Sequence, residues 1–162
     1  SAFVANLKLK SKKDIFFTRY TYGDPVPVYP DRHGLQDPVP YRYLGRTKTG
    51  VMLVTGIANP APLRQFLEQN LRIDDELVFG DHHEYDLKDI RFIQNRFQTI
   101  EQVDKCIMVT EKDAVRLQEL DIPDKRFRKS FYYIPVEVRF LAKGEKPFIK
   151  RIYKYLKKSG NK

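Results

Sequence analysis

Residues 51–56 read Val-Met-Leu-Val-Thr-Gly, a continuous apolar run that ends at a threonine and a glycine. An apolar run of this length, without polar alternation, is typical of a strand buried on both faces of a parallel sheet. Residues 106–110, Cys-Ile-Met-Val-Thr, repeat the pattern. Helical spacing of apolar residues follows each run, over residues 60–70 and 111–120. These two strand-helix pairs indicate an α/β fold.

The rest of residues 47–162 continues the alternation. Asp86, with Asp89 three residues later, predicts the start of a helix. In the same way, Asn59 and Pro60 predict the cap and first residue of the helix before it. The remaining expected elements are strands at 77–79, 131–134 and 136–140 and helices at 86–97 and 146–158. We therefore predict a three-layer α/β/α sandwich with a mostly parallel sheet over residues 47–162.

Residues 1–46 have a different character and are expected to form an extended β-ribbon connector. Aromatic and β-branched residues at 15–22 predict a strand, and residues 41–44 are the expected second strand. The proline-rich segments at 25–30 and 38–40 predict loop or edge structure, because proline cannot donate to a sheet. Because an isolated ribbon is marginally stable, we expect another part of the protein to pack against it.

The net charge of +9 is unevenly distributed. Residues 51–124 carry 8 basic and 15 acidic side chains, whereas residues 125–162 carry 13 and 2. This pattern is a poor fit to a nucleic-acid-binding body, and it favours a phosphate-bearing ligand or an anionic membrane surface. The alternative is that the lysines only keep the surface soluble. No apolar stretch reaches the ~18 residues of a transmembrane helix, and no signal peptide is predicted at the start.

Three polar segments follow predicted strands, at residues 55–60, 80–83 and 110–113. Ligands of open parallel sheets bind at the carboxyl ends of the strands. The candidate site therefore comprises, in chain order, Thr55, Gly56, Asn59, Asp81, His82, His83, Glu111, Lys112 and Asp113.

Asp81-His82-His83 suits acid-base chemistry, because a histidine beside carboxylates titrates near neutral pH. The structural alternative is that one imidazole caps the next helix or packs under it. A zinc site needs four ligands, and only His33 and Cys106 remain as typical ones. Manganese phosphoesterases also carry Asp-His-His, but they need further paired aspartates, and no Asp-x-Asp occurs here. We therefore predict no metal site on this chain.

The other two segments allow an anion to bind. Helix-start amides near Thr110 can receive an anion, and Lys112 can meet a phosphate as a point charge. Alternatively, Thr110 is an ordinary N-cap with acidic residues in the first turn. Gly56 permits close approach of a ligand or simply a tight turn. No P-loop, Gly-x-Gly-x-x-Gly or Gly-x-Ser-x-Gly motif occurs, so the chain alone lacks a recognisable nucleotide-binding apparatus.

Taken together and in order, residues 53–60, 79–85 and 110–116 resemble the C-terminal half of tetraacyldisaccharide 4'-kinase, the lipid A 4'-kinase of Gram-negative bacteria. Residues 16–27 resemble the region that joins the two lobes of that family. The resemblance spans most of residues 15–140. Gly80 stands where the family often has proline, which changes the turn before Asp-His-His.

The resemblance implies a P-loop-type kinase with two α/β/α lobes joined by a β-ribbon. Such an enzyme transfers the γ-phosphate of Mg-ATP to the 4'-hydroxyl of a tetraacyldisaccharide 1-phosphate, at the cytoplasmic face of the inner membrane. ATP and Mg²⁺ are bound mainly by the N-terminal lobe, which this chain does not include. The resemblance also implies that His82, with Asp81 beside it, pairs with an aspartate of that lobe.

We therefore expect a C-terminal lobe that does not turn over alone. Its expected partners are the N-terminal P-loop lobe and the lipid disaccharide, with an anionic membrane surface as a further candidate and no nucleic acid. The basic C-terminal helix is expected to close the sheet, with contact to anionic lipid as the alternative. A rival hypothesis is a non-catalytic module that binds a phosphorylated or anionic partner through Lys112 and the basic tail.

Overall fold

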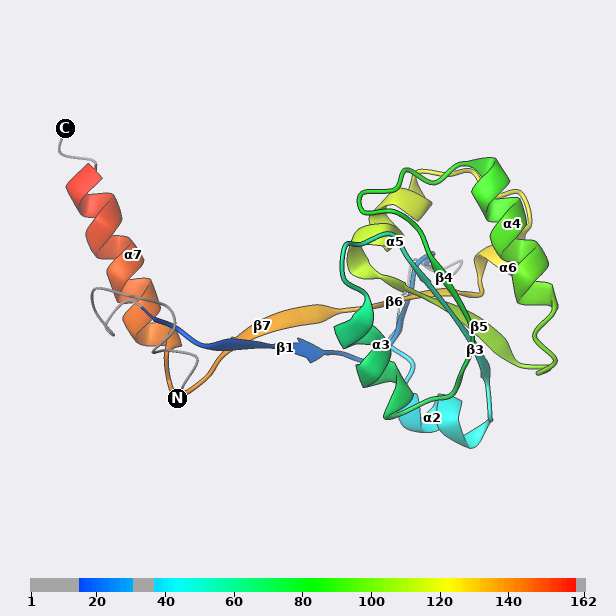
Figure 1. Ribbon diagram of the computed structural model, residues 1–162, viewed down its shortest axis with the longest axis horizontal. Helices are drawn as coiled ribbons and strands as arrows, with labels where there is room; N and C mark the ends of the chain where they lie inside the picture. Colours follow the sequence, from blue (N-terminus) through cyan, green and yellow to red (C-terminus); the bar gives the residue numbers. More distant parts are fainter. Residues whose placement is uncertain (1–14, 31–36, 160–162) are drawn as a thin grey trace. The chain divides into compact units, whose positions relative to one another are not determined.

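The computed structural model describes residues 15–30 and 37–159. The elements, labelled in Figure 1, are β1 (Thr18–Tyr22), β2 (Val26–Pro27), α2 (Tyr41–Arg46), β3 (Gly50–Thr55), α3 (Ala61–Glu68), β4 (Ile73–Val78), α4 (Leu87–Gln98), β5 (Lys105–Thr110), α5 (Glu111–Gln118), α6 (Lys125–Arg128), β6 (Phe131–Ile134), β7 (Val136–Phe140) and α7 (Glu145–Ser159). Among these described residues, no helix is both long and apolar enough to cross a membrane.

The central sheet has five strands in the order β2-β6-β5-β3-β4. Strands β4, β3, β5 and β6 run parallel, and β2 pairs antiparallel with β6 at the edge. The α/β fold with a mostly parallel sheet is thus confirmed. Because parallel strands end at the same edge, the segments that follow β3, β4 and β5 begin side by side.

Helices cover both faces of the sheet. Met52 and Val54 of β3 point into one core, which also contains Ile93 of α4, Leu117 of α5 and Phe127 of α6. Val51 and Leu53 alternate into a second core with Leu44 of α2 and Leu67 of α3. Figure 1 shows these two groups of helices on opposite sides of the sheet. Each fully buried aliphatic side chain contributes about 1.5–3 kcal/mol, so the central strands anchor both layers.

Local capping fixes where the helices begin. The Asp86 carboxylate accepts hydrogen bonds from the backbone N–H groups of Lys88 and Asp89, and Asp89 accepts one in return from the N–H of Asp86. This capping box confirms the helix start expected at Asp86. Helix α3 differs slightly, because Pro60 is its N-cap while Asn59 Oδ1 accepts from Ala61 N at 3.2 Å.

Strand β4 is longer than the sequence predicted. The prediction missed the first residues of the strand because several of them are acidic. The sequence predicts a strand only from Leu77, whereas β4 begins at Ile73 and includes Asp74, Asp75 and Glu76. Acidic residues are depleted from strands, which hides this segment from pattern reasoning. Here each carboxylate lies beside an arginine, as in the pairs Arg72–Asp74, Arg64–Glu76 and Arg96–Asp75.

Contacts divide the chain into two compact units, one of residues 22–136 and one of residues 1–21 with 137–162. The five-stranded sheet lies in the first unit. The second unit combines both ends of the chain, so this division differs from the boundary expected between residues 46 and 47. Helix α7 belongs to the second unit, and the expectation that it closes the sheet stays a prediction.

The ribbon forms, but with a different partner strand. Strand β1 pairs with β7, from the other end of the chain. Residues 41–44, expected to supply the second strand, belong to helix α2 instead. The Tyr43 and Leu44 N–H groups donate to the carbonyl of Pro40, and the Leu44 side chain is buried in the second core. Tertiary packing thus overrides the aromatic, strand-like composition of this short run.

Candidate functional site

The three polar segments meet at the carboxyl edge of the sheet, after the neighbouring strands β4, β3 and β5. Backbone hydrogen bonds join the segment after β4 to the end of β3, from Phe79 N to Thr55 O at 2.7 Å and from His82 N to Gly56 O at 3.2 Å. A side-chain bond joins α5 to the same place, because Gly56 N donates to Asp113 Oδ2 at 3.0 Å. The structure therefore brings the predicted segments together.

The buried Asp113 side chain fixes this edge of the sheet through hydrogen bonds. Its side chain is fully buried, and Oδ2 accepts hydrogen bonds from Gly56 N at 3.0 Å and from the Thr110 hydroxyl at 2.6 Å. Arg116 Nη1 lies 3.5 Å from Oδ1 of the same carboxylate. A buried charge is stable only with such hydrogen bonds and a counter-ion. Asp113 therefore connects β3 to α5 and has no exposed surface of its own.

Gly56 is required by close packing at this point. A Cβ atom there would lie 3.0 Å from Asp113 Oδ1, 3.2 Å from the Tyr85 hydroxyl and 3.3 Å from His83 Cβ. Burial and the neighbouring Asp113 carboxylate raise the pKa of Tyr85, so its hydroxyl stays protonated. Sequence reasoning did not single out Tyr85, although it lies two residues after the Asp-His-His motif.

His82 is the exposed histidine of the motif. Its side chain is 70% accessible, and its backbone has φ 60°, in the left-handed region. That conformation is uncommon for residues other than glycine and costs about 1–3 kcal/mol, so the surroundings must hold it. The His82 N–H is bonded to both Gly56 O and Asp81 Oδ1, the latter at 3.0 Å.

Charged groups surround the His82 ring. Lys112 Nζ lies 3.4 Å from Nε2, and Arg116 Nη2 lies 3.5 Å from Nδ1. Asp81 Oδ2 lies 3.6 Å from Nε2, and Lys112 also comes within 3.9 Å of Asp81 Oδ1. The site thus presents one accessible imidazole, two cations and one carboxylate. That arrangement can engage an anionic group or a carboxylate brought from outside.

His83 has a different environment. Its Nε2 lies 2.8 Å from Asp89 Oδ2, and its ring stacks on Phe79 with centroids 4.5 Å apart. The ring edge of Tyr85 completes its surroundings at 5.0 Å. The alternative that one imidazole packs against the next helix therefore describes His83, because Asp89 belongs to the capping box of α4.

The remaining predicted residues make local contacts at the same edge. Asn59, just before the N-cap of α3, accepts a hydrogen bond from Ala61 N and is exposed. Glu111 Oε2 accepts from Val136 N at 3.4 Å, and Thr55 is fully buried. Arg116 was missed by sequence reasoning. The signal was its spacing, because it lies four residues after Lys112 and three after Asp113 on one face of α5.

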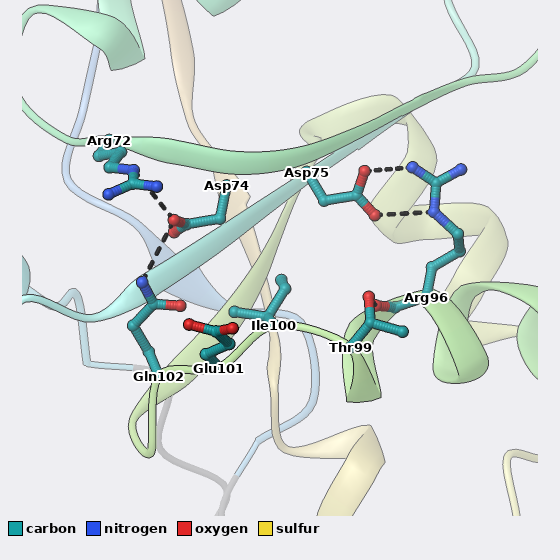
Figure 2. Close-up of a pocket in the computed structure, with 8 residues that line it drawn as sticks. All are labelled: Arg72, Asp74, Asp75, Arg96, Thr99, Ile100, Glu101 and Gln102. Atoms are coloured by element: carbon teal, nitrogen blue, oxygen red, sulfur yellow. Dashed lines mark hydrogen bonds and ion pairs between the residues drawn. The ribbon is translucent and has the colours of Figure 1, made fainter.

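Two cavities lie at the opposite edge of the sheet. Figure 2 shows one of about 410 Å³, where Asp74 lies between Arg72 and Gln102, and Asp75 pairs with Arg96. A second cavity of about 520 Å³ shares Arg72, Asp74 and Gln102. The aspartates of this edge are already paired with arginines, which leaves them little capacity for a ligand.

Of the two further residues considered for zinc, the structure describes Cys106 but not His33. Cys106 is buried in β5, and burial raises its pKa to about 12. His33 lies outside the described residues. Within residues 15–30 and 37–159, no group of three or more histidine, cysteine, aspartate or glutamate side chains is arranged to hold a metal ion.

Comparison with known proteins gives consistent matches. Residues 27–157 match the family model described as tetraacyldisaccharide-1-P 4'-kinase. The chain is 33% identical over 153 residues to the tetraacyldisaccharide 4'-kinase of Parabacteroides distasonis, covering 93% of this chain and 40% of that protein. The corresponding kinase of Bacteroides thetaiotaomicron is 32% identical over 157 residues, covering 94% and 41%. The chain thus spans about 40% of the length of these relatives.

A structural match supports the same fold. The crystal structure described as the "apo" form of LpxK from Aquifex aeolicus in complex with ATP aligns with a TM-score of 0.52 at 15% identity. The alignment covers 94% of this chain and 39% of that one.

Proposed function

The chain belongs to the tetraacyldisaccharide-1-P 4'-kinase family, and from that premise we propose that it is the C-terminal lobe of a two-lobe lipid kinase. The complete enzyme transfers the γ-phosphate of ATP to the 4'-hydroxyl of a tetraacyldisaccharide 1-phosphate in lipid A biosynthesis. The observation that carries this proposal is the accessible His82 ring beside Lys112, Arg116 and Asp81, in a chain whose sequence has no P-loop. The chain supplies one side of an active site.

ATP and Mg²⁺ fit poorly on this chain alone. The described residues offer no metal-binding group of three acidic, histidine or cysteine side chains, and the sequence has no phosphate-cradling loop. We assign both to the preceding P-loop lobe. The same assignment explains the expected lack of turnover by this chain, because phosphoryl transfer depends on positioning and on neutralising the phosphate charge.

The residues of this edge have separate roles in the proposal. His82 approaches an aspartate of the preceding lobe, and this pair takes the proton from the attacking 4'-hydroxyl. Asp81 holds the His82 backbone, and the cation Lys112 offsets the negative charge that collects between the lobes. The buried residues Asp113, Gly56 and Thr110 keep these groups in place without touching substrate.

The test uses the longer kinase with His82→Asn, because asparagine tolerates a left-handed backbone but lacks the imidazole. We expect the rate of phosphate transfer to fall about 10²- to 10⁴-fold, the usual contribution of acid-base catalysis. The matched control is Lys88→Ala, an exposed residue in the first turn of α4, which should change the rate less than about threefold. Turnover within twofold of the wild type in His82→Asn would remove the catalytic role.

We also propose contact with an anionic membrane at the cytoplasmic face of the inner membrane, made by α7. Ile149, Ile152 and Leu156 form one exposed apolar stripe, at 43%, 45% and 56% accessibility, and lysines occupy the other face. Amphipathic helices of this kind lie in the lipid interface. The non-catalytic alternative, an anion-binding module, is favoured by the same basic surface.

Vesicle flotation of the 162-residue chain separates these functions. Membrane contact through α7 predicts binding to vesicles that contain anionic lipid, weaker at high salt and lost in Ile152→Glu. An anion-binding module predicts instead that binding to inorganic phosphate or nucleotide is lost in Lys112→Met and retained in Ile152→Glu. Absence of vesicle binding by both the chain and the longer kinase would contradict membrane contact.

A further inference from the structure

Each nitrogen of the His82 ring lies beside a cation that can only donate hydrogen bonds, and Nε2 also lies 3.6 Å from Asp81 Oδ2. Arg116 Nη2 lies 3.5 Å from Nδ1, and Lys112 Nζ lies 3.4 Å from Nε2. A guanidinium and an ammonium have no acceptor atom, whereas a neutral imidazole has one acceptor nitrogen and one N–H. Only one of the two cations can therefore be satisfied by the ring at a time. The cation that donates to the ring therefore determines which nitrogen carries the imidazole proton.

Arg116 is the better anchored of the two cations. Its side chain is 21% accessible, and Nη1 approaches the fully buried Asp113 carboxylate at 3.5 Å. Asp113 is in turn fixed by Gly56 N and by Thr110. The planar guanidinium thus spans from a buried anion to the ring, which is a geometry that arginine suits.

Lys112 has more freedom. Its side chain is 45% accessible, and its ammonium has a second acceptor in Asp81 Oδ1 at 3.9 Å. A lysine on a flexible stem can turn away from Nε2 at little cost, because water and Asp81 satisfy it equally well. The ring therefore keeps its hydrogen bond from Arg116 and gives up the one from Lys112.

We propose that Arg116 is a positioning residue, which holds His82 in the tautomer that carries its proton on Nε2. Arg116 donates to Nδ1, so Nδ1 is the acceptor and Nε2–H points toward the open side of the site. The His82 N–H donates to Gly56 O and Asp81 Oδ1, and these bonds hold the backbone at φ 60°. The fixed backbone in turn fixes the position of the His82 Cβ atom, from which the ring extends. Asp81 Oδ2, 3.6 Å from Nε2, is a carboxylate on this side of the ring.

The inference deepens the role proposed for His82, and for its catalytic meaning it rests on that proposed function. With the proton on Nε2, the imidazole donates to a carboxylate and orients it, and it does not itself accept the proton of the hydroxyl. The aspartate of the preceding lobe is then the proton acceptor. Arg116 acts only through His82, so it touches neither the substrate nor the reacting atoms.

Nitrogen-15 NMR of the 162-residue chain tests this directly, without substrate or activity. Long-range proton-nitrogen spectra of the neutral ring distinguish the two tautomers of an imidazole. We expect Nε2–H to dominate at His82. In Arg116→Met the ratio of Nε2–H to Nδ1–H should fall about tenfold, the effect of one charged hydrogen bond. Lys112→Met removes a cation from the same ring and should leave the ratio within twofold.

A second variant, Arg116→Lys, controls for the possibility that Arg116→Met fails to fold. Arg116→Lys keeps a positive charge beside Asp113, but one ammonium cannot span both Asp113 and His82, so the ratio should fall in this variant also. A proton mainly on Nδ1 in the wild type, or an unchanged ratio in both Arg116 variants, overturns the proposal. Failure of the His82 activity test with the expected tautomer shift would instead refute the proposed catalytic function alone.

Discussion

Replacing Asp113 by alanine tests whether one buried carboxylate holds the candidate site together. The change leaves Gly56 N–H without its acceptor, which costs about 1–3 kcal/mol for a buried donor. It also removes the acceptor of the Thr110 hydroxyl and the counter-ion of Arg116, a largely buried pair. The combined loss in the free energy of unfolding is about 3–5 kcal/mol, a large fraction of the 5–15 kcal/mol of a typical domain.

The assay is urea unfolding of the 162-residue chain, followed by far-UV circular dichroism. Asp113→Asn should lose less, about 1–3 kcal/mol, because an amide oxygen still accepts from Gly56. Glu111→Ala, in the same first turn of α5 but exposed, serves as the matched control and should change stability by less than about 0.5 kcal/mol. A loss below 1 kcal/mol in Asp113→Ala would refute the reasoning.

Three further predictions follow from the same contacts. Gly56→Ala should destabilise the chain by about 1–3 kcal/mol by calorimetry, because its Cβ would lie 3.0 Å from Asp113 Oδ1; an unchanged melting temperature would contradict this packing. Backbone hydrogen bonds from Asp89 and Lys88 lower the pKa of Asp86, so its stabilisation is present above about pH 4 and is lost as the pH falls further. The stability advantage of the wild type over Asp86→Ala should therefore shrink below pH 4, and a constant advantage would refute the cap. Burial raises the pKa of Cys106 to about 12, so a thiol reagent at pH 8 should label it only after urea unfolding, whereas rapid native labelling would show an open strand β5.

The parallel sheet could be predicted because its central strands are recognisable in the sequence as continuous apolar runs. Strands β3 and β5 are apolar throughout, and both end at threonines followed by helical patterns. The capping box at Asp86 and Asp89 was equally visible, because three-residue spacing of acidic side chains is a local signal. Convergence of the three polar segments then followed from topology alone.

Other features depend on contacts that are distant in sequence. The pairing of β1 with β7 joins residues more than a hundred positions apart, and no local pattern specifies it. Helix α2 forms because Leu44 is buried, although its neighbours have strand-like aromatic side chains. Both cases show tertiary packing deciding between local alternatives.

The sequence predicted that the three polar segments converge, but it did not predict the different surroundings of their side chains. His82 and His83 are identical in sequence terms, yet one is exposed between two cations and the other is bonded to Asp89. His82 also has a left-handed backbone, with φ 60°, which no local sequence pattern indicated. Arg116 was missed because its partner Asp113 becomes buried only in the folded chain.

Single-turnover phosphate transfer by the longer kinase carrying His82→Asn tests the central claim most directly, because it measures the chemical step apart from product release. If this edge of the sheet completes the active site, the rate constant should fall at least about 100-fold while lipid binding changes little. A rate constant equal to that of the wild type would show that phosphate transfer proceeds without this imidazole.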